Sequence, residues 1–225
     1  MDFARLVFVI MAKDLRAELR TKEAVNASLA FAVVILVLLS FVVEANDVPL
    51  PVLGGLLWLV FAFAGTLVLN RSFAREVPND CLDALIAAPI SGAALFLGKA
   101  LANFVLVLAV ELVALPIFGI FYNVRWTQQV WQLMLVVVLG TWGVTVIGTV
   151  FSALTVNIRL REVMLPMLTY PMLLPALLAA MELTGSLVTG VPIGPETVTW
   201  LKLLIGFDVL FTAASVTLVE FILVG

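Results

Sequence analysis

The sequence predicts an all-α integral membrane protein, in which six transmembrane helices follow an N-terminal amphipathic helix. Of the 225 residues, 64% are hydrophobic and only 12% are charged, which is far outside the composition of soluble domains. The apolar runs reach roughly 20 residues, the length that crosses a bilayer as a helix. They do not alternate with polar residues as the strands of a membrane β-barrel do, so helices must satisfy the backbone hydrogen bonds. No linker or repeat divides the chain, and a single transmembrane domain over residues 1–225 is expected.

The first element, at about residues 2–22, is predicted to be an amphipathic helix that lies in the membrane interface. Its apolar residues recur every three or four positions, and basic residues lie on the opposite side: Phe3, Leu6, Val7, Ile10 and Met11 against Arg5, Lys13, Arg16 and Arg20.

Two carboxylates disturb this pattern, because Asp14 and Glu18 fall on the apolar side of the helix. Either the helix bends before Asp14, or both carboxylates face protein and not lipid. We predict that they face protein, since two like charges four residues apart would be doubly unfavourable against lipid. The expected neighbours are the basic turns with Arg71, Arg75, Arg159 and Arg161.

The six spans are expected at about residues 24–43, 52–69, 93–122, 131–154, 163–183 and 200–223. The first two are apolar runs joined by a short acidic connection. The third is too long to stand straight in about 30 Å of hydrocarbon, and Pro116 offers a kink, so a tilted or broken helix is expected. The fourth carries Gly140, Gly143 and Gly148, which permit close helix approach.

The fifth span contains Pro166, Pro171 and Pro175. Its N-terminal half is therefore expected to be irregular and covered by protein. A loop punctuated by Gly and Pro follows, and the sixth span begins near Trp200.

Basic residues are distributed unevenly around these spans. Ten Lys and Arg residues fall on the side of both termini, and only Arg125 and Lys202 fall on the other side. By the positive-inside rule, both termini and the loop at 71–99 are predicted to be cytoplasmic.

The composition also limits the chemistry of the chain. It has no histidine and a single cysteine, Cys81. Histidine is the commonest metal and haem ligand and the usual proton carrier at neutral pH, so the chain lacks both. We expect no catalytic residue, no metal site and no cofactor bound by this chain.

Segment 71–99 is the longest polar interruption that also carries basic residues, and we interpret it as a docking loop. Within it, residues 81–88 are predicted to form a short amphipathic helix. Leu82, Leu85 and Ile86 fall at i, i+3 and i+4, which gives this helix one apolar edge. The alternative is a solvated loop with one accidental helical turn.

Charged residues accompany this apolar edge. Asp83 lies in the first turn, where a carboxylate favours the helix dipole, and Arg75 and Glu76 precede it as an expected polar rim. Residues 92–99 superficially resemble a phosphate-binding loop, but the spacing is one residue too long and no Ser or Thr follows for magnesium. If the protein uses ATP, a different chain hydrolyses it.

Two further carboxylates are predicted inside the membrane. Glu111 lies about 12 residues beyond Lys99, hence roughly 18 Å along a helix, and Asp208 lies in the first half of the sixth span. Both are functional candidates, because placing a carboxylate in hydrocarbon has a high free-energy cost. The alternative is a protonated or hydrogen-bonded group with a structural role.

Several stretches together resemble one family: KDLRAELRTKE at 13–23, FAREVPNDCLDALIAAPISGAALFLGK at 73–99, ELVALPIFGIFYN at 111–123, LGTWGVTVIGTVFSAL at 139–154 and REVMLPMLTYPMLLPALLAA at 161–180. Their order around six spans is similar to the permease subunit of the ABC transporter for c-type cytochrome maturation, the haem exporter protein B (CcmB) family. The resemblance covers almost the whole chain.

The resemblance implies an ABC-2-type permease architecture in the bacterial inner membrane, with residues 2–22 as an elbow helix. It implies that loop 71–99 contacts a separate ATPase subunit, which binds the ATP. Other implied partners are a haem-handling membrane subunit of the same pathway and a second copy of the permease, surrounded by membrane lipid and without nucleic acid. Haem is the implied candidate cargo.

Two alternatives stay open. A proton-coupled secondary transporter would use Glu111 and Asp208 as relays, but a single six-helix unit without an evident inverted repeat speaks against it. A purely structural membrane subunit would tolerate neutral substitutions at these acids.

Overall fold

The computed structural model describes residues 2–42, 50–77, 90–124, 128–156 and 158–224, and every regular element in these ranges is a helix. Six of the helices are long and apolar enough to cross a membrane. The helices are α1 (Phe3–Thr21), α2 (Glu23–Val42), α3 (Leu50–Leu69), α5 (Gly92–Phe121), α6 (Val130–Thr155), α7 (Arg161–Val188) and α8 (Val198–Val224). The predicted all-α membrane fold with an additional N-terminal helix is confirmed. The short helix predicted at 81–88 lies outside the described residues.

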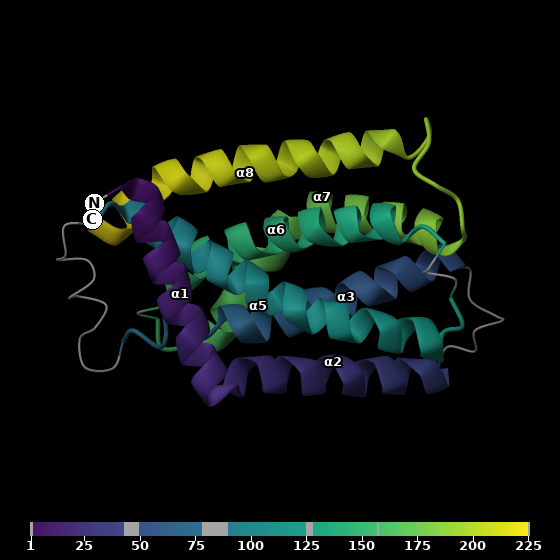
Figure 1. The fold of residues 1–225 in the computed structure, drawn as a ribbon, viewed down its shortest axis with the longest axis horizontal. Coiled ribbons are helices and arrows are strands. Elements are labelled where there is room, and N and C mark those ends of the chain that lie inside the picture. The colour runs from purple at the N-terminus through teal and green to yellow at the C-terminus, as the bar shows by residue number, and fades with distance from the viewer. Residues whose placement is uncertain (1, 43–49, 78–89, 125–127, 157, 225) are drawn as a thin grey trace.

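The six long helices run side by side, and α1 crosses them at the end where both chain termini lie (Figure 1). Lys22 separates α1 from α2 with a φ of 55°, which turns the chain from the crossing direction into the bundle. Because successive long helices alternate in direction, α2, α5 and α7 begin at this end. The ten basic residues counted on the side of the termini therefore gather at one end of the bundle.

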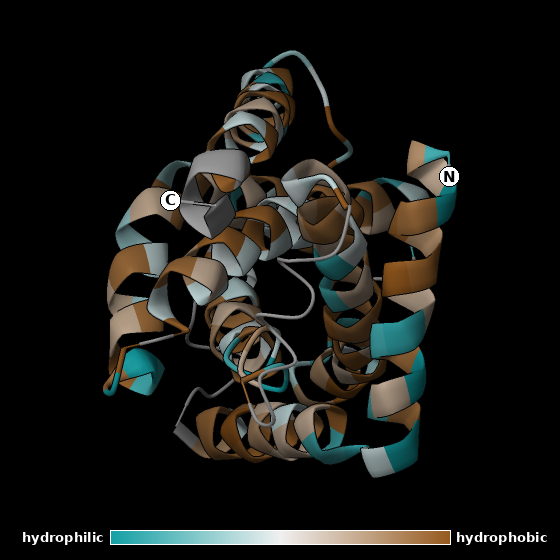
Figure 2. Cartoon of the chain, turned by 90° about the vertical axis from the view of Figure 1, so that its left-hand side faces the viewer, coloured by the Kyte–Doolittle hydropathy of each residue, from teal (hydrophilic) through white to brown (hydrophobic). Residues whose placement is uncertain are grey.

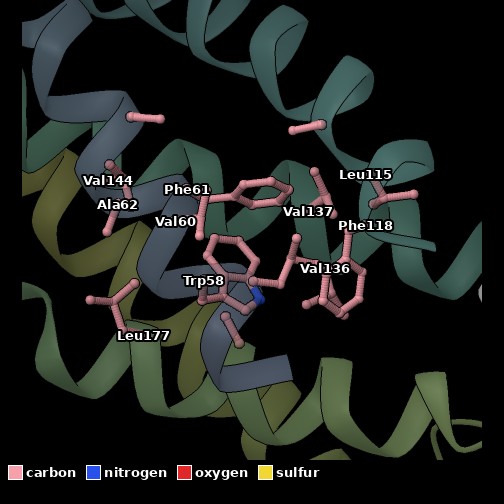
Figure 3. Close-up of a cluster of buried hydrophobic side chains, with 14 of the residues drawn as sticks. Trp58, Val60, Phe61, Ala62, Leu115, Phe118, Val136, Val137, Val144 and Leu177 are labelled. Atoms are coloured by element: carbon pink, nitrogen blue, oxygen red, sulfur yellow. The ribbon is translucent and has the colours of Figure 1, made fainter. Parts of the chain in front are cut away.

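The core lies among α3, α5, α6 and α7, where buried aromatic and aliphatic side chains interdigitate (Figure 3). Trp58 is at its centre, and its indole Nε1 donates to the Thr184 hydroxyl at 2.9 Å. Gly140 allows the indole ring to lie on the backbone of α6, because a Cβ at this position would overlap the ring. Similarly, a Cβ at Gly54 would lie 2.6 Å from the backbone nitrogen of Gly185, so α3 and α7 touch directly. The glycines of α6, for which close helix approach was predicted, make room for side chains of neighbouring helices: Gly140 for Trp58, Gly143 for Asp208 and Gly148 for Leu69.

The predicted irregularity of the N-terminal half of α7 is wrong, and of the two forms expected for α5, tilted or broken, the broken form is wrong. Helix α7 is continuous through its three prolines and α5 is continuous through Pro116. Proline removes one backbone donor but has a helical φ, and in apolar surroundings an open backbone would leave many more polar groups unsatisfied. Helix α7 also continues to Val188, into the stretch predicted as a loop.

Candidate functional site

A tight turn after α3 forms the first part of the candidate site. The chain leaves α3 at Leu69 and folds back over residues 70–77. Phe73 anchors the turn, because its side chain is fully buried against the end of α6. Arg75 and Glu76 are thereby placed against α1 and α5.

Lys99, near the start of α5, is fully buried at the centre of the site. Its Nζ donates to Asp14 Oδ2 at 3.1 Å and to Glu76 Oε1 at 3.0 Å. A third bond, of 3.0 Å, goes to the backbone carbonyl of Ser72. These acceptors match the three N–H donors of an ammonium group, as a buried charge requires. Lys99 therefore joins α1, α5 and the turn after α3.

Two more ion pairs attach the turn to α1. Lys13 Nζ lies 2.5 Å from Glu76 Oε1, and the Arg75 guanidinium donates to the Glu18 carboxylate. Glu18 is almost completely buried, and its other oxygen accepts the backbone N–H of Val25 at 2.9 Å. Glu18 thus also binds the first turn of α2.

The charges in this site stabilise one another. Burial alone would raise the pKa of the Glu76 carboxyl, but Lys99 and Lys13 outweigh burial and hold the pKa below its ordinary value of 4.5. Burial alone would lower the pKa of Lys13, but Glu76 and Asp14 outweigh it and hold the pKa above its ordinary value of 10.5. Both groups are therefore charged at neutral pH. We call the whole set the end cluster: Lys13, Asp14, Glu18, Ser72, Arg75, Glu76 and Lys99.

Close packing of α1 on α5 brings the end cluster together. At Gly98, a Cβ would lie 2.7 Å from the Cβ of Ile10 and 3.0 Å from the Val7 carbonyl oxygen. A larger residue would thus push α1 away from Lys99.

A buried polar seam continues from the end cluster between α5 and α6. Asn103 Nδ2 donates to the hydroxyls of Ser72 and Thr149, each at 2.9 Å. Along α6, the hydroxyls of Thr149 and Thr145 bond to backbone carbonyls one turn earlier. The seam ends at Thr141, whose hydroxyl contacts the Glu111 carboxyl.

Asp208 on α8 lies apart from this seam. Both carboxyl oxygens are buried, without a hydrogen-bond partner among the described residues. They pack against Gly143 of α6, where a Cβ would lie 2.8 Å from Oδ1. Thr141 and Gly143 are two positions apart in one helix, hence roughly 200° apart around its axis. Glu111 and Asp208 therefore lie on opposite sides of α6.

The structure brings four of the predicted site residues together: Asp14, Glu18, Arg75 and Glu76. Both acids of α1 face protein, as the sequence analysis expected. Arg159 and Arg161, however, form no ion pair with them in the described part of the chain. Glu111 and Asp208 stay separate from the end cluster, and four residues of the predicted docking helix lie outside the described residues: Leu82, Asp83, Leu85 and Ile86.

The sequence analysis did not identify the roles of Lys99, Ser72 and Asn103. One signal was available, because Lys99, Asn103 and Glu111 are four and eight positions apart in an otherwise apolar helix. This spacing places polar groups on one helix face. Ser72 had no such signal, since only the turn after α3 brings its carbonyl and hydroxyl to α5.

Comparisons with known proteins show similarity over most of the chain. A family model described as CcmB protein matches residues 5–223. The Heme exporter protein B of Rhodobacter capsulatus is 31% identical over 213 residues, which are 94% of each chain. The Heme exporter protein B of Paracoccus denitrificans is 27% identical, over 77% of this chain and 79% of its own. The protein of that name from Pseudomonas aeruginosa is 24% identical, over 95% of this chain and 92% of its own.

Proposed function

Because the chain belongs to the CcmB family, we propose that it is the membrane-spanning permease subunit of an ABC-type haem exporter. Haem as the cargo is inferred from the name of the relatives, Heme exporter protein B. A separate ATPase subunit would supply the energy, since residues 92–99 form the first turns of α5 and not a phosphate-binding loop. The exporter would act in the maturation of c-type cytochromes.

The observation that carries this proposal is the end cluster. A permease driven by another chain needs a rigid connection between the surface that meets the ATPase and the helices that cross the membrane. In this protein, Arg75 and Glu76 of the turn after α3 are bonded to α1, and Glu76 is also bonded to Lys99 of α5. A displacement of the turn would therefore move α1 and α5 with it.

The polar seam extends this connection into the bundle. Asn103 binds the turn through Ser72 and binds α6 through Thr149. Helices α5 and α6 thus receive the same displacement, at a place where threonine side chains replace bulky apolar contacts. This arrangement supports a mechanical role for the seam.

The proposal assigns the end of the bundle that carries the cluster and both termini to the cytoplasm. The ATPase would contact this end through Arg75 and Glu76 and through the residues that follow: Leu82, Asp83, Leu85 and Ile86. A haem-handling membrane subunit of the same pathway and a second permease copy would complete the complex in the bacterial inner membrane.

Co-purification from the native membrane tests the proposal. A tagged copy of this chain should bring an ABC ATPase subunit with it, and its deletion should abolish covalent haem attachment to c-type cytochromes. The decisive control disables ATP hydrolysis in that partner by replacing its phosphate-binding lysine. Normal cytochrome maturation with the disabled ATPase would rule out an ATP-driven permease and favour the proton-coupled alternative.

A further inference from the structure

Helix α1 has an exposed outer face that mixes arginine with large apolar side chains. Three of these apolar residues are more than half exposed: Phe8 at 61%, Val9 at 53% and Leu19 at 66%. Arg5, Arg16 and Arg20 are exposed beside them. At 100° per residue, all six fall within one side of the helix. We call this set the outer face of α1: Arg5, Phe8, Val9, Arg16, Leu19 and Arg20.

The opposite side of α1 is fixed to the protein, so the outer face cannot turn inward. Val7 and Ile10 are buried against α5, where Gly98 allows close contact. Asp14 and Glu18 are held there by the end cluster. The apolar stripe that the sequence analysis identified thus includes the side that meets the bundle, and a second apolar surface points outward.

The position of α1 places its outer face at the membrane boundary. The helix contacts the first turns of α5 and leads directly into α2 at Glu23, so it lies at the level where membrane-crossing helices begin. In the end view of Figure 2, α1 follows the edge of the bundle, with hydrophilic and hydrophobic residues along it. A helix at this level and edge of a membrane protein meets the lipid headgroups and the adjoining part of the acyl chains.

The positive charge of the three arginines on this face favours anionic lipids over neutral ones. In the described part of the chain, none of its three guanidinium groups forms an ion pair with a carboxylate. The other acids of α1, Asp14 and Glu18, are turned inward and paired in the end cluster. Asp2 stands at the start of the helix, and the exposed Glu23 beyond its end is paired with Arg71. Guanidinium groups form paired hydrogen bonds with phosphate oxygens. Transfer of the exposed apolar residues between them from water into the acyl region is favourable.

We propose that the outer face of α1 is a binding surface for anionic phospholipid headgroups. Arg5, Arg16 and Arg20 contact the phosphates, and Phe8, Val9 and Leu19 insert between the neighbouring acyl chains. This arrangement holds the end cluster at a fixed depth relative to the leaflet. The proposal is independent of the cargo and of the ATPase partner.

Lipid retention tests the charged part of the surface. The full chain is reconstituted into nanodiscs of equal parts phosphatidylglycerol and phosphatidylcholine, released, and examined by native mass spectrometry for bound lipid. Wild type should retain phosphatidylglycerol preferentially. In the triple variant R5Q/R16Q/R20Q, the ratio of retained phosphatidylglycerol to phosphatidylcholine should be at least about tenfold lower. Each Lys or Arg near an anionic surface typically increases the affinity about fivefold.

Two further variants make the result specific. R159Q/R161Q/K202Q removes three positive charges away from α1 and should retain the wild-type preference. R5K/R16K/R20K keeps the charge and should recover most of it, which excludes misfolding as the cause of the loss. An unchanged preference in R5Q/R16Q/R20Q, or an equal loss in R159Q/R161Q/K202Q, would overturn the proposal.

A fluorescent probe tests the apolar part of the same surface. Because Cys81 is the only cysteine, C81S/L19C carries an environment-sensitive dye at position 19 alone. In nanodiscs, the dye should report apolar surroundings, more strongly with phosphatidylglycerol than with phosphatidylcholine. A dye that stays in water until the ATPase is added, or that responds equally to inorganic phosphate in detergent, would show a different occupant and refute lipid binding.

Discussion

Lys99 is a buried charge whose partners come from two other segments, α1 and the turn after α3. Its removal should therefore lower the stability of the protein by more than the loss of its own hydrogen bonds. Lys99→Met would leave Asp14 and Glu76 with only the half-exposed Lys13 as a common partner. Breaking a buried ion pair typically costs roughly 3–5 kcal/mol of stability. We expect a clear fall in melting temperature in detergent, measured by fluorescence-detected size-exclusion chromatography after heating.

Two comparison variants define this result. Lys202→Met removes an exposed lysine from α8 and should leave the melting temperature nearly unchanged. D14N/E76Q/K99M also removes the two stranded carboxylates and should regain part of the loss. If the triple variant is no better than Lys99→Met, unpaired charge is not the cause of the instability.

Glu76 should make the stability of the protein depend on pH in acid. Its pKa is lowered in the folded state by Lys99 and Lys13 against the effect of burial. Its stabilising contribution is therefore present above the ordinary pKa of 4.5 and is lost as the pH falls through the lower, folded value. The difference in stability between wild type and Glu76→Gln should be constant from neutral pH down to about pH 5 and vanish at lower pH.

Thermal unfolding between pH 7 and pH 3 measures this difference. Glu196→Gln, which changes an exposed acid in the loop before α8, provides the matched control. A stability difference that grows as the pH falls would contradict the assigned direction of the Glu76 pKa.

Glu111 should act as a structural hydrogen-bonding group and not as a proton relay. Its partner is the Thr141 hydroxyl, and the next hydroxyls along α6 bond to backbone carbonyls. Glutamine keeps the volume and can keep this contact, so cells with Glu111→Gln should retain c-type cytochrome to within about twofold. Glu111→Leu leaves Thr141 without this partner and should lower the membrane level of the protein. Near-complete loss of cytochrome c in Glu111→Gln, with normal level and assembly, would favour the proton-coupled alternative.

At this scale, the sequence predicted that Asp14 and Glu18 are turned inward, with Arg75, which pairs with Glu18, among their neighbours. It did not identify Lys99 as the partner of Asp14. The helical phase of Asp14 and Glu18 was the basis for predicting that both face protein and not lipid. Their partners depend on the return of the chain after α3 and on the packing of α1 across α5. Such contacts join residues 57 and 85 positions apart in the chain, so no local sequence pattern could predict them.

The packing of α1 on α5 depends on one glycine. Gly98→Ala would place a Cβ 2.7 Å from Ile10 and 3.0 Å from the Val7 carbonyl, so α1 would have to move. Overpacking of this kind typically costs about 1–3 kcal/mol. Gly206→Ala is the matched control, because a Cβ at Gly206 meets nothing within 4 Å. The melting temperature should fall for Gly98→Ala and not for Gly206→Ala, and an equal response of the two variants would argue against a close contact.

Helix existence was predictable here, whereas helix continuity was not. Hydropathy identified each of the six long helices, because apolar length is what the bilayer requires of a spanning helix. The three prolines of α7 were misleading, since the prediction transferred their helix-breaking effect in water to an apolar environment. There, the remaining backbone bonds have no competing solvent, and α3 and α6 pack against the same helix.

Over the whole molecule, the proposed path of force begins at the predicted docking helix and passes through the end cluster. Leu82, Leu85 and Ile86 form the predicted apolar edge of that helix, and each would contribute about 1.5–3 kcal/mol on burial in a partner, before ordering costs. The charged residues before it have a second task besides the contact with the ATPase, because the structure binds Arg75 to Glu18 and Glu76 to Lys99. Attachment to the ATPase and transmission to the helices should therefore be separable by mutation.

Leu85→Asp and Arg75→Ala test this separation. Leu85→Asp should detach the ATPase and stop cytochrome maturation, yet leave the protein at its normal membrane level, because the change lies outside the long apolar helices. Arg75→Ala should weaken association with the ATPase more mildly, but should uncouple the complex by leaving the buried Glu18 without its cation. The measurements are co-purification with the ATPase, ATP hydrolysis by the purified complex and haem attachment to cytochrome c. If Leu85→Asp leaves the association intact, residue 85 is not at the docking surface. If Arg75→Ala loses the ATPase as completely as Leu85→Asp does, the end cluster belongs to the docking surface itself and does not transmit force from it.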